Sequence, residues 1–191
     1  MIEIEKKYEL TDHDYQIIKN NCSFVVKKNV YDNFYDTNDF SLFQKKIKLR
    51  ERNGEMQLKM KISDPIENYS KSLELLEKEE INNKLHEMWI EYENTKKVLE
   101  IYTEVEKYTY EYKWFVFILD IQKYKYNNRY EIELEFDEDN EIDAENIIND
   151  FRCFLGLTAQ EQISTETKVI TCAKHENPEL YEVILQTKVG E

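Results

Sequence analysis

Apolar and polar residues alternate along much of the chain, as in strands that bury one face. In KKIKLRER (45–52), Ile47 and Leu49 share one face. The other face carries Lys46, Lys48, Arg50 and Arg52. EMQLKMKIS (55–63) alternates in the same way. The intervening Asn53-Gly54 is a strong signal for a two-residue hairpin turn. These two segments therefore predict an antiparallel pair of strands.

Further strands are predicted where alternation or β-branched and aromatic content recurs. These segments are 1–9, 25–37, 70–76, 99–110, 114–126 and 128–137, and 165–174 is interpreted as a last strand in a mixed tail. The pattern predicts about eight strands, joined mostly by hairpins.

Helical spacing of apolar residues marks the remaining segments. The predicted helices lie at 12–21, 77–97, 143–154 and 178–188. With only 3 Gly and 2 Pro in 191 residues, a long flexible linker is not expected. We therefore predict a single domain over residues 1–191, with a helical segment at about 77–97.

Many of the predicted strands carry one charged face. Its basic members are Lys7, Lys46, Lys48, Arg50, Arg52, Lys59 and Lys61, and its acidic members are Glu3, Glu5, Glu131, Glu133 and Glu135. If these faces converge, the sheet closes around a polar interior with its apolar faces outward under helices. Such an interior would bind a highly charged anion through Lys and Arg, and a divalent cation through Glu.

The first strand alone leaves two interpretations open. Glu3, Glu5 and Lys7 share one face of it, and this face is either the solvated side of an edge strand or the lining of a polar interior. Motifs later in the chain are needed to distinguish the solvated face from the polar interior.

The overall charge of the chain argues against some classes of binding partner. With 26 basic and 40 acidic residues, the net charge is −14, which argues against binding nucleic acid or an anionic membrane through the outer surface. No apolar run reaches the length of a membrane span, and no secretory signal opens the chain. Cys22, Cys153 and Cys172 lie far apart and indicate reduced thiols in a cytoplasmic protein.

A series of motifs follows in order along nearly the whole chain. It comprises Glu3-x-Glu5-x-Lys7, Tyr35-Asp36-Thr37, Leu49-Arg50-Glu51-Arg52, Leu58-Lys59, Leu119-Asp120, Tyr130-Glu131-Ile132-Glu133 and Lys168. This series resembles the CYTH superfamily, the triphosphate tunnel metalloenzymes, in which the first motif is the ExExK signature. The resemblance favours the polar interior over the solvated face.

The resemblance implies an α+β fold, in which an eight-stranded antiparallel β-barrel forms a triphosphate tunnel with a polar lumen and helices packed outside. It implies Mg²⁺ or Mn²⁺ as cofactor, held by Glu3, Glu5, Glu131 and Glu133. The expected phosphate-binding residues are Lys7, Arg50, Arg52, Lys59, Lys61, Lys107 and Lys168. Glu3, Glu5 and Lys7 are expected to be catalytic, and Asp120 and Glu74 to support the site. Lys168 is expected on a C-terminal strand.

The sequence departs from the family pattern near residue 107. The family often has K-x-R there, whereas this chain has Lys107-Tyr108-Thr109, so one basic contact is missing. Arg129 and Lys123 are two candidates to replace it.

The expected reaction is metal-dependent hydrolysis of a triphosphate, either inorganic tripolyphosphate or a small organic triphosphate, because the recognisable features address phosphates only. A class IV-type adenylate cyclase is the alternative enzyme, and a non-catalytic polyphosphate or nucleotide sensor is the alternative binding protein. Both glutamate pairs favour an enzyme over a sensor. The expected partner is a small-molecule triphosphate, and the resemblance leaves a homodimer open because relatives include dimers.

Overall fold

The structure is a computed structural model of the chain. It describes residues 2–62, 71–136, 144–161 and 167–189. Only the backbone is described at residues 2–5, 61–62, 71–72, 133–136, 144–145 and 188–189.

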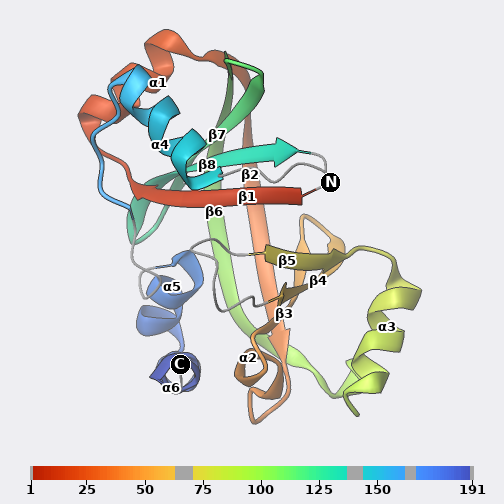
Figure 1. Cartoon of the computed structure of the whole chain (residues 1–191). Helices are drawn as coiled ribbons and strands as arrows, with labels where there is room; N and C mark the ends of the chain where they lie inside the picture. The colour runs from red at the N-terminus through yellow and green to blue at the C-terminus, as the bar shows by residue number, and fades with distance from the viewer. Residues whose placement is uncertain (1, 63–70, 137–143, 162–166, 190–191) are drawn as a thin grey trace. The chain divides into compact units, whose positions relative to one another are not determined.

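Eight strands form one sheet in the order β1-β8-β7-β6-β2-β3-β4-β5 (Figure 1). They are β1 (Ile2–Glu9), β2 (Ser23–Asp36), β3 (Ile47–Arg52), β4 (Glu55–Ile62), β5 (Lys71–Leu75), β6 (Lys96–Tyr112), β7 (Phe115–Tyr124) and β8 (Asn127–Phe136). The pairings of β1 with β8, β7 with β8, β6 with β7, β2 with β3 and β3 with β4 are antiparallel. The eight-stranded antiparallel sheet with outer helices confirms the predicted fold class.

The β3–β4 hairpin turns at the two residues that the sequence indicated. Asn53 has φ 51° and Gly54 has φ 91°, so both central residues adopt positive φ. Two consecutive positive values are characteristic of a type I′ turn, whose twist matches that of the flanking strands. The turn fixes the register in which Arg50 lies opposite Gln57 and Lys48 opposite Lys59.

Helices occupy the connections and the C-terminal part. They are α1 (Asp12–Asn21), α2 (Ser41–Gln44), α3 (Lys78–Glu87), α4 (Ala144–Leu155), α5 (Lys168–Glu176) and α6 (Pro178–Val189), with a 3₁₀ turn at Tyr92–Asn94. Among the helices of the described residues, none combines the length and apolar character needed to cross a membrane.

Two predicted elements are wrong in type or extent. The last strand predicted at 165–174 is helical from Lys168 onward, as α5. The helix predicted at 77–97 ends at Glu87, because Trp89 takes a left-handed backbone conformation with φ 60° and β6 begins at Lys96.

The chain divides into two compact units. Unit 1 consists of Met1–Asn29, Ser63–Lys71 and Thr103–Ile163, and unit 2 consists of Val30–Ile62, Ser72–Tyr102 and Ser164–Glu191. Because β2 and β6 extend through both sets of residues, each contributes backbone to both units. The single domain over residues 1–191 stays a prediction.

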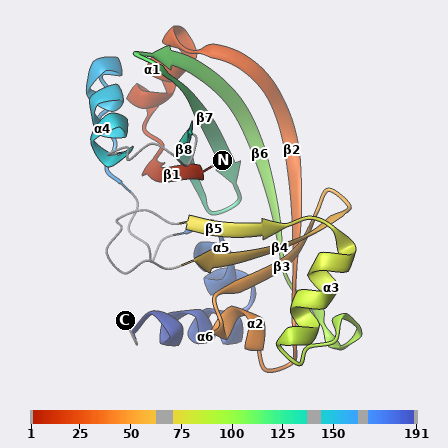
Figure 2. The same ribbon diagram turned by 45° about the vertical axis from the view of Figure 1, so that its right-hand side comes forward.

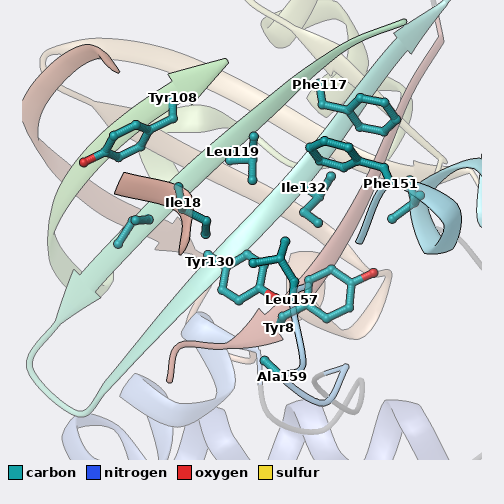
Figure 3. Packing of buried hydrophobic residues seen from close by; sticks show 12 residues of the cluster. Tyr8, Ile18, Tyr108, Phe117, Leu119, Tyr130, Ile132, Phe151, Leu157 and Ala159 are labelled. Atoms are coloured by element: carbon teal, nitrogen blue, oxygen red, sulfur yellow. The ribbon is translucent and has the colours of Figure 1, made fainter. Parts of the chain in front are cut away.

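Unit 1 buries an aromatic and aliphatic core between the strands β1, β6, β7 and β8 and the helices α1 and α4 (Figure 3). The rings of Phe117 in β7 and Phe151 in α4 stack with centroids 3.9 Å apart. Ile132 and Tyr130 of β8 point into the same core. Since side chains alternate along a strand, the neighbours Glu131 and Arg129 belong to the opposite face of β8.

Unit 2 has its own core, formed where α3 packs on β3 and β4 (Figure 2). Ile81 and Leu85 of α3 contact the cluster that contains Leu49 and Leu58. Leu49 lies opposite Leu58 in the β3–β4 register, so the two strands present one continuous apolar face to the helix. The other face of the two strands carries Lys48, Arg50, Arg52 and Lys59.

Candidate functional site

In unit 2, one buried carboxylate holds two of the predicted phosphate-binding cations. Asp32 in β2 is fully buried and lies opposite Arg52 in the β2–β3 register. Its Oδ1 accepts a hydrogen bond from Arg52 Nε at 2.7 Å, and its Oδ2 accepts from Arg52 Nη2 at 3.1 Å. Lys168 Nζ, at the start of α5, donates to the same Oδ2 at 3.2 Å. We call Asp32, Arg52 and Lys168 the Asp32 cluster.

The electrostatics of this cluster favour the ionised carboxylate. Burial by itself raises the pKa of Asp32, but the hydrogen bonds from Arg52 and the charges of Lys168, Arg52 and Arg50 outweigh it. The pKa of Asp32 therefore lies below its ordinary value. The carboxylate fixes two cations that belong to elements far apart in the sequence.

Arg50 is the next cation on the same face of β3. Its side chain is buried, and Nε donates to Gln57 Oε1 at 2.7 Å while Nη2 pairs with Glu74 Oε1 at 2.9 Å. Burial and the neighbouring charge of Arg52 lower the pKa of Arg50. Lys59 shares this face by register, opposite Lys48. Unit 2 thus gathers Arg50, Arg52, Lys59 and Lys168, with Glu74 as a supporting carboxylate.

In unit 1, a second cluster lies on the face of β7 and β8 that points away from the helices. Glu131 is buried, and Lys7 Nζ pairs with its Oε1 at 3.4 Å. Gln122 Nε2 donates to Glu131 Oε2 at 2.6 Å, and Arg129 Nη2 donates to Glu131 Oε1. We call Lys7, Gln122, Arg129 and Glu131 the Glu131 cluster.

Asp120 and Lys107 adjoin the Glu131 cluster by register. Asp120 lies opposite Glu131 on one side and Lys107 on the other, and Lys107 Nζ is 3.7 Å from Asp120 Oδ1. Burial raises the pKa of Asp120, and the nearby Glu131 raises it further, while Lys107 opposes both. Asp120 Oδ1 is buried and has no hydrogen-bond partner among the described residues.

The remaining predicted ligands are placed by backbone alone. In the β1–β8 register, Glu5 lies opposite Glu133 and Glu3 opposite Glu135. The side chains of Glu3, Glu5, Glu133 and Lys61 lie outside the described residues. Within the part of the chain whose side chains are described, no group of three or more Asp, Glu, His or Cys could hold a metal ion.

Two residues near Lys107 belong to the other face of the sheet. Glu106 accepts hydrogen bonds from Tyr15 and Lys27, and Lys123 Nζ lies 3.7 Å from it and over the ring of Tyr15. Since Tyr15 packs against the unit 1 core, these groups stabilise α1 against the sheet. Lys123 therefore does not replace the missing basic contact near Lys107.

Sequence reasoning missed Asp32, Gln57 and Gln122, whose side chains form hydrogen bonds with the predicted site residues. It also left Arg129 only as a candidate. Cross-strand register was the signal that could have found them, because Asp32 pairs with Arg52, and Gln122 with Arg129, on neighbouring strands. Lys168 was predicted on a strand, and its correct position is the first turn of α5.

Comparison with known proteins places the chain in a family. A model of the CYTH domain family matches residues 1–170. A comparison with curated proteins finds no match.

Several solved structures share the fold. A protein of Pyrococcus horikoshii OT3 is 22% identical with a TM-score of 0.56, over 85% of this chain and 94% of that one. A Hippeastrum protein, described as an adenylyl cyclase candidate with a dominant triphosphatase activity, is 15% identical with a TM-score of 0.69, over 92% and 97%. A Bacillus halodurans adenylate cyclase candidate is 19% identical with a TM-score of 0.54, over 88% and 95%.

Proposed function

This chain belongs to the CYTH domain family, and we propose that it is a metal-dependent triphosphatase that hydrolyses inorganic tripolyphosphate or a small organic triphosphate. The observation that carries the proposal is the pairing, within each unit, of predicted phosphate-binding cations with a buried acidic group. Arg52 and Lys168 are held by Asp32, and Lys7 by Glu131. Cations fixed in this way stabilise phosphoryl charge without reorganisation.

The donor set suits a hard divalent cation. The β1–β8 register brings Glu5 opposite Glu133, and the buried Asp120 Oδ1 lacks a hydrogen bond within the described residues. Carboxylate oxygens are the ligands that Mg²⁺ and Mn²⁺ prefer. We assign Glu3, Glu5, Glu131 and Glu133 to this cation. When bound, the cation neutralises phosphoryl oxygens and orients a water molecule.

The protein's own side chains bind the phosphates, stabilise the developing charge and accept the proton. Arg50, Arg52, Lys59 and Lys168 bind phosphate oxygens in this proposal, and Lys7 offsets the charge that grows on the transferred phosphoryl group. A carboxylate of the Glu3-x-Glu5 pair accepts the proton of the attacking water. The new P–O bond forms to the water oxygen, and the bond to the leaving diphosphate breaks.

The test is phosphate release from tripolyphosphate, ATP and thiamine triphosphate with Mg²⁺ or Mn²⁺, beside a cyclic AMP assay of the ATP sample. Metal-dependent release of phosphate supports the proposal. Cyclic AMP with diphosphate would move the reaction to cyclisation, which the descriptions of the Hippeastrum and Bacillus relatives keep as the second candidate. Tight binding of tripolyphosphate without turnover would instead indicate a sensor.

A variant pair sharpens this test. Glu5→Gln should abolish metal-dependent turnover while the fold survives. Glu100→Gln is the matched control, because Glu100 is an exposed glutamate of β6 that pairs only with the nearby Lys97 among the described contacts. Equal loss of activity in both variants would contradict the assignment of Glu5.

A further inference from the structure

Arg129 is a buried arginine with one donor group left over. It is 4% exposed, its Nε and Nη2 donate to Gln122 Oε1 at 3.3 and 3.1 Å, and Nη2 also donates to Glu131. Its Nη1 is buried without a hydrogen-bond partner among the described residues. Burying an N–H donor of a charged group without an acceptor costs free energy. We therefore expect Nη1 to have a further hydrogen-bond acceptor.

The guanidinium is held before any ligand arrives. Gln122 lies directly opposite Arg129 in the β7–β8 register, and the ring centroid of Tyr124 is 5.9 Å from the guanidinium carbon. Because the guanidinium is planar, fixing Nε and Nη2 also fixes the direction of the two N–H bonds of Nη1. Binding through Nη1 therefore costs little side-chain entropy.

Two further cations share this face of the sheet with Arg129. They are Lys7, which pairs with Glu131, and Lys107, whose Nζ lies 3.7 Å from Asp120. An acceptor with negative charge, such as a phosphoryl oxygen, forms a stronger hydrogen bond with a guanidinium than a neutral one does.

We propose that Arg129 is a phosphate-binding residue of this chain, and that its Nη1 donates to an oxygen of the bound triphosphate. The inference rests on the proposed function and assigns to Arg129 the basic contact that the strand at Lys107 lacks. Lys123, the other candidate, pairs with Glu106 on the opposite face of the sheet.

The test compares Arg129→Met and Arg129→Lys with Lys123→Met as the matched control. Tripolyphosphate affinity is measured by calorimetry in a metal chelator, and KM and kcat are measured with Mg²⁺. We expect Arg129→Met to weaken affinity by about 10- to 100-fold, the effect of losing one hydrogen bond to a charged group. The affinity of Arg129→Lys for tripolyphosphate should lie between those of the wild type and Arg129→Met, because lysine keeps the charge but lacks the paired N–H groups of the guanidinium. Lys123→Met should bind tripolyphosphate as tightly as the wild type does.

A second measurement separates phosphate binding from neutralisation of Glu131. In a Glu131→Gln background, the effect of Arg129→Met on metal-free affinity should persist. Its disappearance there, or unchanged affinity in both folded Arg129 variants, would overturn the inference and leave the proposed function standing. A wild-type protein that neither binds nor hydrolyses tripolyphosphate would overturn both.

Discussion

The Asp32 cluster gives the sharpest stability prediction, because one isosteric substitution removes its central charge. Asp32→Asn keeps the shape of the side chain in β2 and replaces a carboxylate with a neutral amide. Arg52 and Lys168 then lose their shared anion inside unit 2. We expect a folded protein with a lower free energy of unfolding.

The magnitude follows from the contacts. Asp32 accepts three hydrogen bonds from charged donors, at 2.7, 3.1 and 3.2 Å. An asparagine keeps one acceptor oxygen. One bond is lost if that oxygen takes the Oδ2 position and two are lost if it takes the Oδ1 position, and each bond contributes about 1.5–3 kcal/mol. Water can hydrogen-bond to Arg52, whose side chain is 34% exposed, and this offsets part of the lost free energy. We therefore expect a loss of about 3 kcal/mol, within the range known for breaking a buried ion pair.

The assay is equilibrium unfolding in urea. With an m value of about 2.5 kcal/mol/M for a chain of this size, the midpoint should fall by about 1 M. Asp150→Asn is the control, because Asp150 pairs with Lys113 at the surface with both side chains more than half exposed. A midpoint shift for Asp32→Asn no larger than that of the control would refute the reasoning.

The pH dependence provides a second check on the same variant. The pKa of Asp32 is lower in the folded protein than its ordinary value of 3.8, so the carboxylate stabilises the fold above that pH. This stabilisation is lost as the pH falls from there through the folded pKa. The difference in unfolding free energy between wild type and Asp32→Asn should therefore be constant near neutral pH and narrow below about pH 4.

Three further predictions concern packing and reactivity. Phe151→Ala removes the ring stacked on Phe117 in the unit 1 core and should cost about 3–5 kcal/mol in urea unfolding. Asp14→Ala leaves the backbone N–H groups of residues 158 and 159 and a tyrosine hydroxyl without their acceptor and should cost about 3 kcal/mol, whereas a loss near zero would mean that water replaces the carboxylate. Cys22, whose pKa burial raises to about 11, should react with iodoacetamide at pH 8 far more slowly than the exposed Cys153, which peptide mapping by mass spectrometry can quantify.

The strands were predictable because each carries its own local signal. The alternation in 45–52 and 55–63 predicts two strands. The intervening Asn53-Gly54 predicts a two-residue turn, which also sets the register between them. The eight-stranded sheet followed from repeating that reasoning along the chain.

The C-terminal error has a physical cause. The segment from Lys168 begins with Lys-Val-Ile-Thr, whose β-branched residues favour strands by propensity. In the structure, Val169, Ile170, Cys172 and Ala173 are buried on α5. Burial on one side of a helix overrides a propensity difference of a few tenths of a kcal/mol per residue.

The partners of the site residues could not be found by local reasoning. Arg52 and Lys168 were both predicted as phosphate-binding residues, but the carboxylate that they share lies on a different strand. Arg129 and Lys123 lie on opposite faces of the sheet, and which face each residue takes depends on where the β7–β8 hairpin turns. Which residues meet across strands depends on register and tertiary packing. Both are set by the whole fold and cannot be inferred from a short segment of sequence.

The Asp32 cluster also makes completion of the chain part of its stability. Asp32 lies 20 residues before Arg52 but 136 residues before Lys168. At about 5–20 residues per second, a ribosome delivers Lys168 roughly 7 to 27 s after Asp32. Until α5 emerges, the nascent chain therefore supplies Asp32 with the arginines of β3 but not with the hydrogen bond from Lys168. We expect a translation product that stops short of this helix to be less stable, because its buried carboxylate lacks the ion pair with Lys168.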